Sequence, residues 1–114
     1  MGDVFGGTYV CAQGESTMRL RVTSMSKGRV EAIFEFEHAP SSVKGSFRMT
    51  GTFDPKEGAL DLAPTVWIVA PPHYAFAPIS GHLRGSSLDG SIRHPKCGAF
   101  KTKRINEWDN PIFP

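Results

Sequence analysis

Apolar and polar residues alternate along most of this chain, and this alternation limits the folds open to it more than any other feature. In residues 17–23 the apolar side chains take every even position, as Met18, Leu20 and Val22, with arginines between them. Successive side chains of a β-strand point to opposite faces, so the spacing predicts a strand with one buried face. After a turn-like segment, residues 30–37 repeat the pattern with glutamates on the polar side, which predicts a hairpin.

Further segments of the same kind bring the total to eight, and none of the chain shows the 3.6-residue period of a capped helix. The expected strands are residues 8–13, 17–23, 30–37, 46–53, 60–67, 77–83, 88–92 and 98–104. Short strands joined mostly by short connections favour sequential pairing. The sequence therefore predicts an all-β fold, an antiparallel eight-stranded up-and-down meander that forms a closed or nearly closed small barrel. We expect one domain over residues 1–104 and an extended tail, 105–114, packed on the barrel or on a partner.

The balance of charge argues against nucleic acid and membrane partners. Thirteen basic and eleven acidic residues leave a net charge of +2, and the two signs are interleaved along the chain. A nucleic-acid-binding domain concentrates its basic residues, and the nearest equivalent here, Lys96 with residues 101–104, is better explained as a solvated strand face. No segment has the ~20 apolar residues that span a bilayer, and no secretory leader is visible. We expect a cytoplasmic protein.

Two cysteines, Cys11 and Cys97, fall in the first and last expected strands or their edges. Closure of the barrel would bring these strands together, so the sequence predicts neighbouring cysteines, either as two thiols or as a disulfide. His94 and His82 could join them as zinc ligands, but only one ligand pair has the two-residue spacing of a structural zinc site. We expect no metal and no cofactor.

The segment 67–76, Trp-Ile-Val-Ala-Pro-Pro-His-Tyr-Ala-Phe, is the strongest candidate for a binding site. It is longer than a hairpin requires, and its large aromatic side chains need a core, a ligand or a partner. One possibility is that the segment plugs the barrel end with its own side chains. The other is that it forms a ligand or partner site. The candidate binding residues are Trp67, His73, Tyr74 and Phe76 in this segment, with Trp108 and Phe113 in the tail.

Catalytic residues are not indicated by any local motif. Asp61 and Asp89 occupy outward positions of their strands, where they would lack the burial that raises the pKa of a carboxyl group for acid catalysis. A nucleophile, a base and a carboxylate must also converge, and no spacing in this chain predicts such an arrangement. We name no catalytic residue.

Three short motifs resemble a group of small bacterial β-barrel domains of uncharacterised function, some of which are attached to caspase-like peptidases. The motifs are Gly7-Thr8-Tyr9-Val10-Cys11-Ala12-Gln13-Gly14, Trp67-Ile68 and Cys97-Gly98-Ala99-Phe100. The resemblance implies a fold and no activity. The general plan is also similar to avidin-like and lipocalin-like barrels, although lipocalins begin with Gly-x-Trp where this chain has Gly7-x-Tyr9.

Three functions remain open from the sequence. The first is a non-enzymatic binding module that presents the 67–76 segment and the tail to a peptide, to another protein or to a second copy of itself as a homodimer. The second is a barrel that carries a small apolar ligand. The third is a hydrolase of unknown type. The volume inside the barrel is the observation that best separates a ligand carrier from a surface-binding module.

Overall fold

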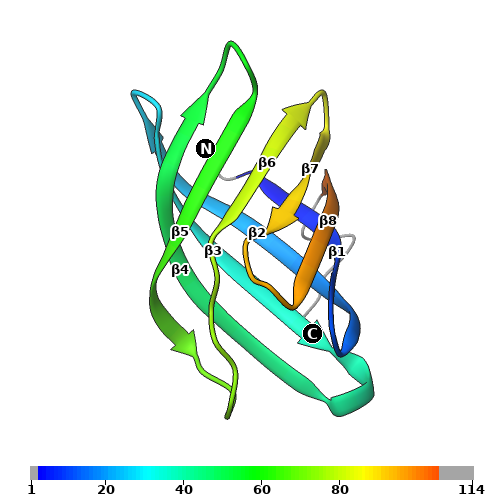
Figure 1. Cartoon of the computed structure of the whole chain (residues 1–114). Coiled ribbons are helices and arrows are strands. Elements are labelled where there is room, and N and C mark those ends of the chain that lie inside the picture. The colour runs from blue at the N-terminus through cyan, green and yellow to red at the C-terminus, as the bar shows by residue number, and fades with distance from the viewer. Residues whose placement is uncertain (1–2, 106–114) are drawn as a thin grey trace.

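The computed structural model describes residues 3–105, and these form a closed antiparallel barrel (Figure 1). The strands are β1 (Val4–Cys11), β2 (Gly14–Ser26), β3 (Arg29–His38), β4 (Val43–Asp54), β5 (Ala59–Val69), β6 (Ile79–Arg84), β7 (Ser87–Ile92) and β8 (Cys97–Arg104). Each strand pairs with the next along the chain, and β8 pairs with β1. The predicted fold class is therefore confirmed.

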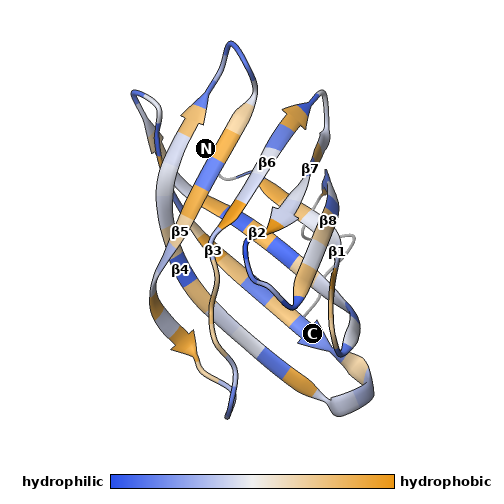
Figure 2. Ribbon diagram, viewed as in Figure 1, coloured by the Kyte–Doolittle hydropathy of each residue, from blue (hydrophilic) through white to orange (hydrophobic). Residues whose placement is uncertain are grey.

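The β2–β3 hairpin shows how alternation produces this fold. Met18 lies opposite Phe36 and Leu20 lies opposite Phe34, and all four side chains are buried in the barrel. Orange and blue bands alternate along both strands in Figure 2. On the outer face Arg21 pairs with Glu35, at 3.5 Å between Nη2 and Oε1. Burial of the inward row is the main stabilising contribution, since each such side chain contributes about 1.5 to 3 kcal/mol, whereas a partly exposed ion pair on the outer face adds about 1 kcal/mol or less.

Closure depends on close contact between the first and last strands. Gly7 lies opposite Thr102 across the β1–β8 seam, and a Cβ atom at Gly7 would collide with the backbone carbonyl of Lys101. Only glycine fits where two backbones approach this closely. The seam therefore removes both sheet edges that an open meander would expose.

Two expectations need correction. Trp67 lies within β5, which continues to Val69, so the β5–β6 loop covers residues 70–78 rather than 67–76. Arg19, expected on a solvated face, is only 4% exposed although it lies on the outward side of β2. Alternation fixes which side of the sheet a residue occupies, but it does not show whether that side is covered.

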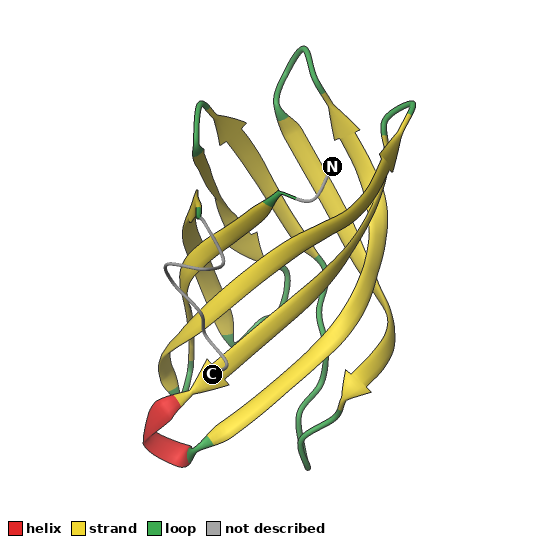
Figure 3. Ribbon diagram, turned by 180° about the vertical axis from the view of Figure 1, so that it is seen from behind, coloured by secondary structure: helices red, strands yellow, loops and turns green. Residues whose placement is uncertain are grey.

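The barrel has two different ends. One end, here called the mouth, is formed by the β1–β2 turn, the β3–β4 connection, the β5–β6 loop and the β7–β8 connection. The β3–β4 connection contains a 3-10 helix, Ala39–Ser41, drawn in red in Figure 3. The other end carries three tight hairpins and the two ends of the described chain, where the Ile105 N–H donates to the Val4 carbonyl at 2.8 Å.

The expected tail, residues 105–114, is described only at Ile105. Trp108 and Phe113, two candidate binding residues, lie outside the described residues. Within residues 3–105, no helix combines the length and apolar character needed to cross a membrane.

Candidate functional site

A cavity of about 310 Å³ lies at the mouth of the barrel. Its inner wall is formed by buried strand residues: Tyr9, Phe34, Phe36, Phe47, Ile79 and Ile92. Its outer wall is formed by residues of the connections at the mouth: Ala12, Gln13, His73, Tyr74, Ala75, Ala77, His94 and Lys96. At the other end the hollow lined by Phe5 and Leu88 is about 40 Å³, little more than the volume of one or two water molecules. The interior is thus filled at one end and hollow at the other.

Aromatic rings make the inner wall rigid. Phe34 and Phe47 stack at 5.1 Å between ring centroids, and Tyr9 meets Phe34 edge-on at 5.8 Å. Contacts of this kind add about 0.5 to 1.5 kcal/mol per pair beyond area burial. Collapse of the wall into the hollow would break these ring contacts, so they oppose it.

The β5–β6 loop turns back toward the barrel at residues 71–74. The Tyr74 N–H donates to the Pro71 carbonyl at 3.4 Å, and His73 has a φ of 66°. This is the arrangement of a type II turn, with proline at the second position and a positive φ at the third. The turn directs the Tyr74 ring onto Phe36, where the two rings stack at 5.6 Å between centroids.

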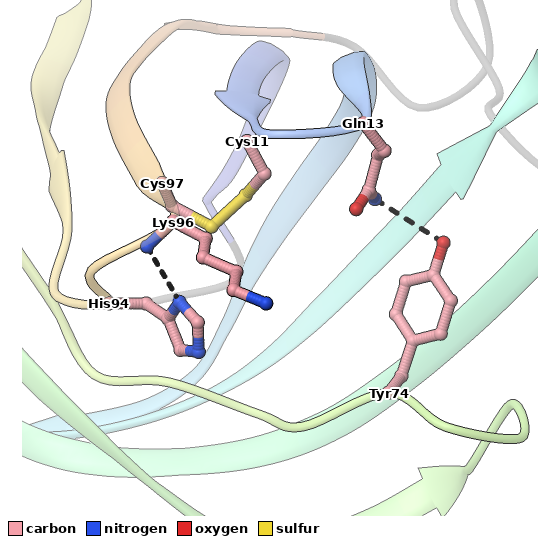
Figure 4. Close-up of a disulfide and its surroundings, with 6 residues drawn as sticks. All are labelled: Cys11, Gln13, Tyr74, His94, Lys96 and Cys97. Carbon is pink, nitrogen blue, oxygen red and sulfur yellow. Dashed lines mark hydrogen bonds between the residues drawn. A yellow bond between two sulfur atoms is a disulfide. The ribbon is translucent and has the colours of Figure 1, made fainter.

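A hydrogen bond joins the β5–β6 loop to the β1–β2 turn across the mouth. Gln13 Nε2 donates to the Tyr74 hydroxyl at 3.3 Å (Figure 4). Both groups line the cavity. Tyr74 therefore covers part of the opening with its ring and presents its hydroxyl at the rim.

Trp67 and Phe76 have a different role from Tyr74. Their rings stack at 5.3 Å between centroids, and both contact Phe47. Neither belongs to the cavity lining, whereas His73 and Tyr74 do. Of the four candidates in segment 67–76, Trp67, Tyr74 and Phe76 pack against the core, and His73 and Tyr74 line the hollow.

Cys11 and Cys97 are joined by a disulfide that forms another part of the cavity lining. They are opposite one another in the β1–β8 pairing, just beyond an irregularity that follows Tyr9. The bond ties the β7–β8 connection to the first strand at the mouth. It also leaves neither sulfur as a thiolate, the form in which a cysteine binds zinc.

His94 and Lys96 lie beside the disulfide on the β7–β8 connection. The Lys96 backbone N–H donates to His94 Nδ1 at 3.0 Å. A neutral imidazole that accepts at Nδ1 carries its proton on Nε2, so His94 is left with a hydrogen-bond donor. In Figure 4 the Lys96 side chain extends away from this bond toward Gln13 and Tyr74.

Tyr9 is the one described residue whose titration is clearly altered. Burial raises the pKa of Tyr9 to about 12, and the nearby Tyr74 adds to the shift, while the Ser16 hydroxyl directly opposite in register lowers it in part. The Ser16 hydroxyl is near enough to Tyr9 to stabilise the phenolate form. The distance and angles at Ser16 Oγ do not meet the criteria for a hydrogen bond. The Tyr9 hydroxyl therefore stays protonated at neutral pH and can donate at the inner wall.

The described part of the chain contains no cluster of side chains suited to hold a metal ion. Among residues 3–105 no three His, Cys, Asp or Glu side chains lie where they could hold a metal ion together. The cavity lining contains no serine, threonine, aspartate or glutamate. Asp61 accepts a hydrogen bond from Ser80 at 2.6 Å on the exposed face. The side chains of the lining that can gain or lose a proton are Tyr9, His73, Tyr74, His94 and Lys96.

Fold and site together define the class of this protein: a closed eight-stranded antiparallel barrel with an aromatic-walled cavity at one mouth. In comparisons with known proteins, the chain matches no family model, no curated protein and no solved structure. The resemblance to small bacterial β-barrel domains therefore stays a prediction.

Proposed function

We propose that this protein binds a small molecule in the cavity at the barrel mouth. The observation that carries the proposal is the volume of about 310 Å³ between an aromatic inner wall and a polar rim. Ligand sites are concave, mostly apolar and equipped with a few polar groups, and their volumes begin at about 300 Å³. Eight strands also enclose an interior just wide enough for one small ligand when side chains do not fill it.

The same geometry disfavours a surface-binding module built on segment 67–76. Trp67, Tyr74 and Phe76 are each partly buried and packed against the core cluster. Anchors of a protein interface must be free to enter a pocket on the partner. Rings already packed against Phe36 and Phe47 are not free in this sense.

Binding of a fluorescent probe with an aromatic body and an anionic sulfonate tests the proposal. Anilinonaphthalene sulfonate should bind the folded chain with a large gain in fluorescence, and Ala77→Trp should reduce the affinity at least about tenfold because indole would occupy the hollow. Ala99→Trp is the matched control, since Ala99 is exposed on β8 and does not line the cavity. Equal binding by both variants, with circular dichroism confirming that both fold, would refute the proposal.

Self-association is a second candidate, favoured by one surface feature. Among the described residues β6 pairs only with Ala59–Leu62 of β5, so the rest of β5 has β4 as its only strand partner. Val66, Ile68 and Val69 on this stretch are 52%, 47% and 53% exposed. An apolar strand with one free edge can pair with the same strand of a second copy.

Light scattering tests this candidate. The full chain should elute as a dimer and Ile68→Lys as a monomer, because a charge on the strand opposes pairing. Thr65→Lys, also exposed on β5, shows whether any added charge has the same effect. A full chain that remains monomeric at high concentration would eliminate self-association.

The cellular location is best tested through the disulfide. The cytoplasmic location expected from the sequence stays a prediction, and the bond between Cys11 and Cys97 opposes it, because disulfides persist mainly in oxidising compartments. Alkylation of free thiols in freshly lysed cells of the source organism would show whether Cys11 and Cys97 form the disulfide inside the cell.

A further inference from the structure

The polar groups around the mouth cavity are almost all hydrogen-bond donors or positive charges. The titratable side chains of the outer wall are His73, His94, Tyr74 and Lys96, and no carboxylate lines the cavity. A hollow with this lining attracts negative charge and offers a cation no carboxylate to pair with. The polar groups of the rim therefore favour a ligand with a negatively charged head group.

Lys96 is the strongest of these groups. Its backbone is held by the hydrogen bond to His94 Nδ1 and by the disulfide at the next residue, Cys97. Its ammonium group makes no ion pair within residues 3–105, and the side chain extends toward the opposite rim (Figure 4). An unpaired lysine at the edge of an apolar hollow is placed to bind an anion entering it.

Two further donors face the same opening from different connections. His94 keeps a proton on Nε2 because Nδ1 accepts from the Lys96 N–H. The Tyr74 hydroxyl accepts from Gln13 Nε2, so its own hydrogen is available to donate. A carboxylate has two acceptor oxygens and no hydrogen, and it can be met by three donors of this kind.

The inner wall limits the polarity and the size of the part of the ligand that enters the barrel. Phe34, Phe36, Ile79 and Ile92 offer only apolar surface, and the Tyr9 hydroxyl is the single polar group among the strand residues of this wall apart from the disulfide. The volume of about 310 Å³ is near the lower end for ligand sites. It suits a compact aliphatic or aromatic body and excludes a long lipid chain.

Resting on the proposed function above, we propose that the cavity binds a small monocarboxylate whose apolar body lies among the phenylalanines and whose carboxylate is held at the rim by Lys96. Lys96 sets the sign of the head group, and His94 and Tyr74 orient it.

A series of ligands with one tail and three head groups tests this assignment. Octanoate, octanol and octylamine are titrated into the full-length protein by calorimetry, below the concentrations at which they form micelles. Octanoate should bind at least about tenfold more tightly than octylamine, and octanol should fall between them. Lys96→Gln should weaken octanoate about tenfold and leave octanol unchanged, whereas Lys96→Arg should keep the preference.

Lys101→Gln is the matched control, since Lys101 is exposed on the outside of β8 and does not line the cavity. Equal affinity for the three ligands, or equal effects of Lys96→Gln and Lys101→Gln, would overturn the monocarboxylate assignment and leave the ligand-binding function intact. Failure of all three ligands, and of anilinonaphthalene sulfonate, to bind would overturn both proposals.

Discussion

Cys11 and Cys97 are 86 residues apart in the chain and 3.8 Å apart at their Cα atoms, joined by the only disulfide that two cysteines can form. The bond crosses the seam between the first and last strands at the mouth and lines the cavity. One covalent link therefore ties the two closing strands together at the mouth and supports the connection that carries His94 and Lys96.

Replacing both cysteines by serine should lower the free energy of unfolding by about 4 kcal/mol, because the bond restricts a very long loop in the unfolded chain. Guanidinium unfolding of wild type and of the double variant measures the loss. A reducing agent should bring the wild type to the midpoint of the variant and leave the variant unchanged. Identical midpoints for the oxidised wild type and the variant would show that the bond does not support the fold.

Gly51→Ala should destabilise the barrel by about 1 to 3 kcal/mol, the usual cost of forcing extra atoms into a packed site. A Cβ at Gly51 would collide with the backbone carbonyl of Asp61 on the neighbouring strand. Gly98→Ala is the control, since a Cβ there meets no atom within 4 Å. Thermal unfolding of both variants checks the expectation, which fails if the two midpoints fall by the same amount.

The strand pattern could be predicted from the sequence because each inward row is a local, period-two signal. Met18, Leu20, Phe34 and Phe36 are all buried as expected. The alternation changes phase at the end of β2, where a register shift follows Val22 and places Met25, at an odd position, opposite the buried Val30. A bulge inserts one unpaired residue, and no pattern within the strand itself marks its position.

The site was only partly predictable. His73 and Tyr74, which line the cavity, are visible in the sequence as part of an aromatic segment, and the proximity of the two cysteines follows from closure of the barrel. Gln13 and Lys96 as rim residues were missed, since both owe their position to long-range closure that brings four connections to one end. The hollow itself depends on how ring volumes fill the barrel, which alternation does not determine.

Tyr74→Ala should lower stability by about 1 to 2 kcal/mol because it removes the ring stacked on Phe36. Tyr74→Phe keeps the ring and loses only the exposed hydrogen bond from Gln13, so it should cost no more than about 0.5 kcal/mol. Thermal unfolding distinguishes the two variants. Equal losses would mean that the hydroxyl, not the stacked ring, holds the loop against the barrel.

Alkaline pH should unfold the wild type more readily than Tyr9→Phe. Burial raises the pKa of Tyr9 from 10.0 to about 12 in the folded chain. Between these values the unfolded chain has lost the Tyr9 proton while the folded chain still holds it, so stability falls as pH rises. Two pH units correspond to about 3 kcal/mol.

Urea unfolding at a series of pH values up to 12 measures this effect. The stability difference between wild type and Tyr9→Phe should be constant below pH 10 and should then shift in favour of Tyr9→Phe. The absorbance of tyrosinate in Tyr74→Phe, where Tyr9 is the only tyrosine left, reports the titration directly. A Tyr9 midpoint near 10 would show that solvent reaches the hydroxyl and that the inner wall of the cavity is more open than the packing of its phenylalanines indicates.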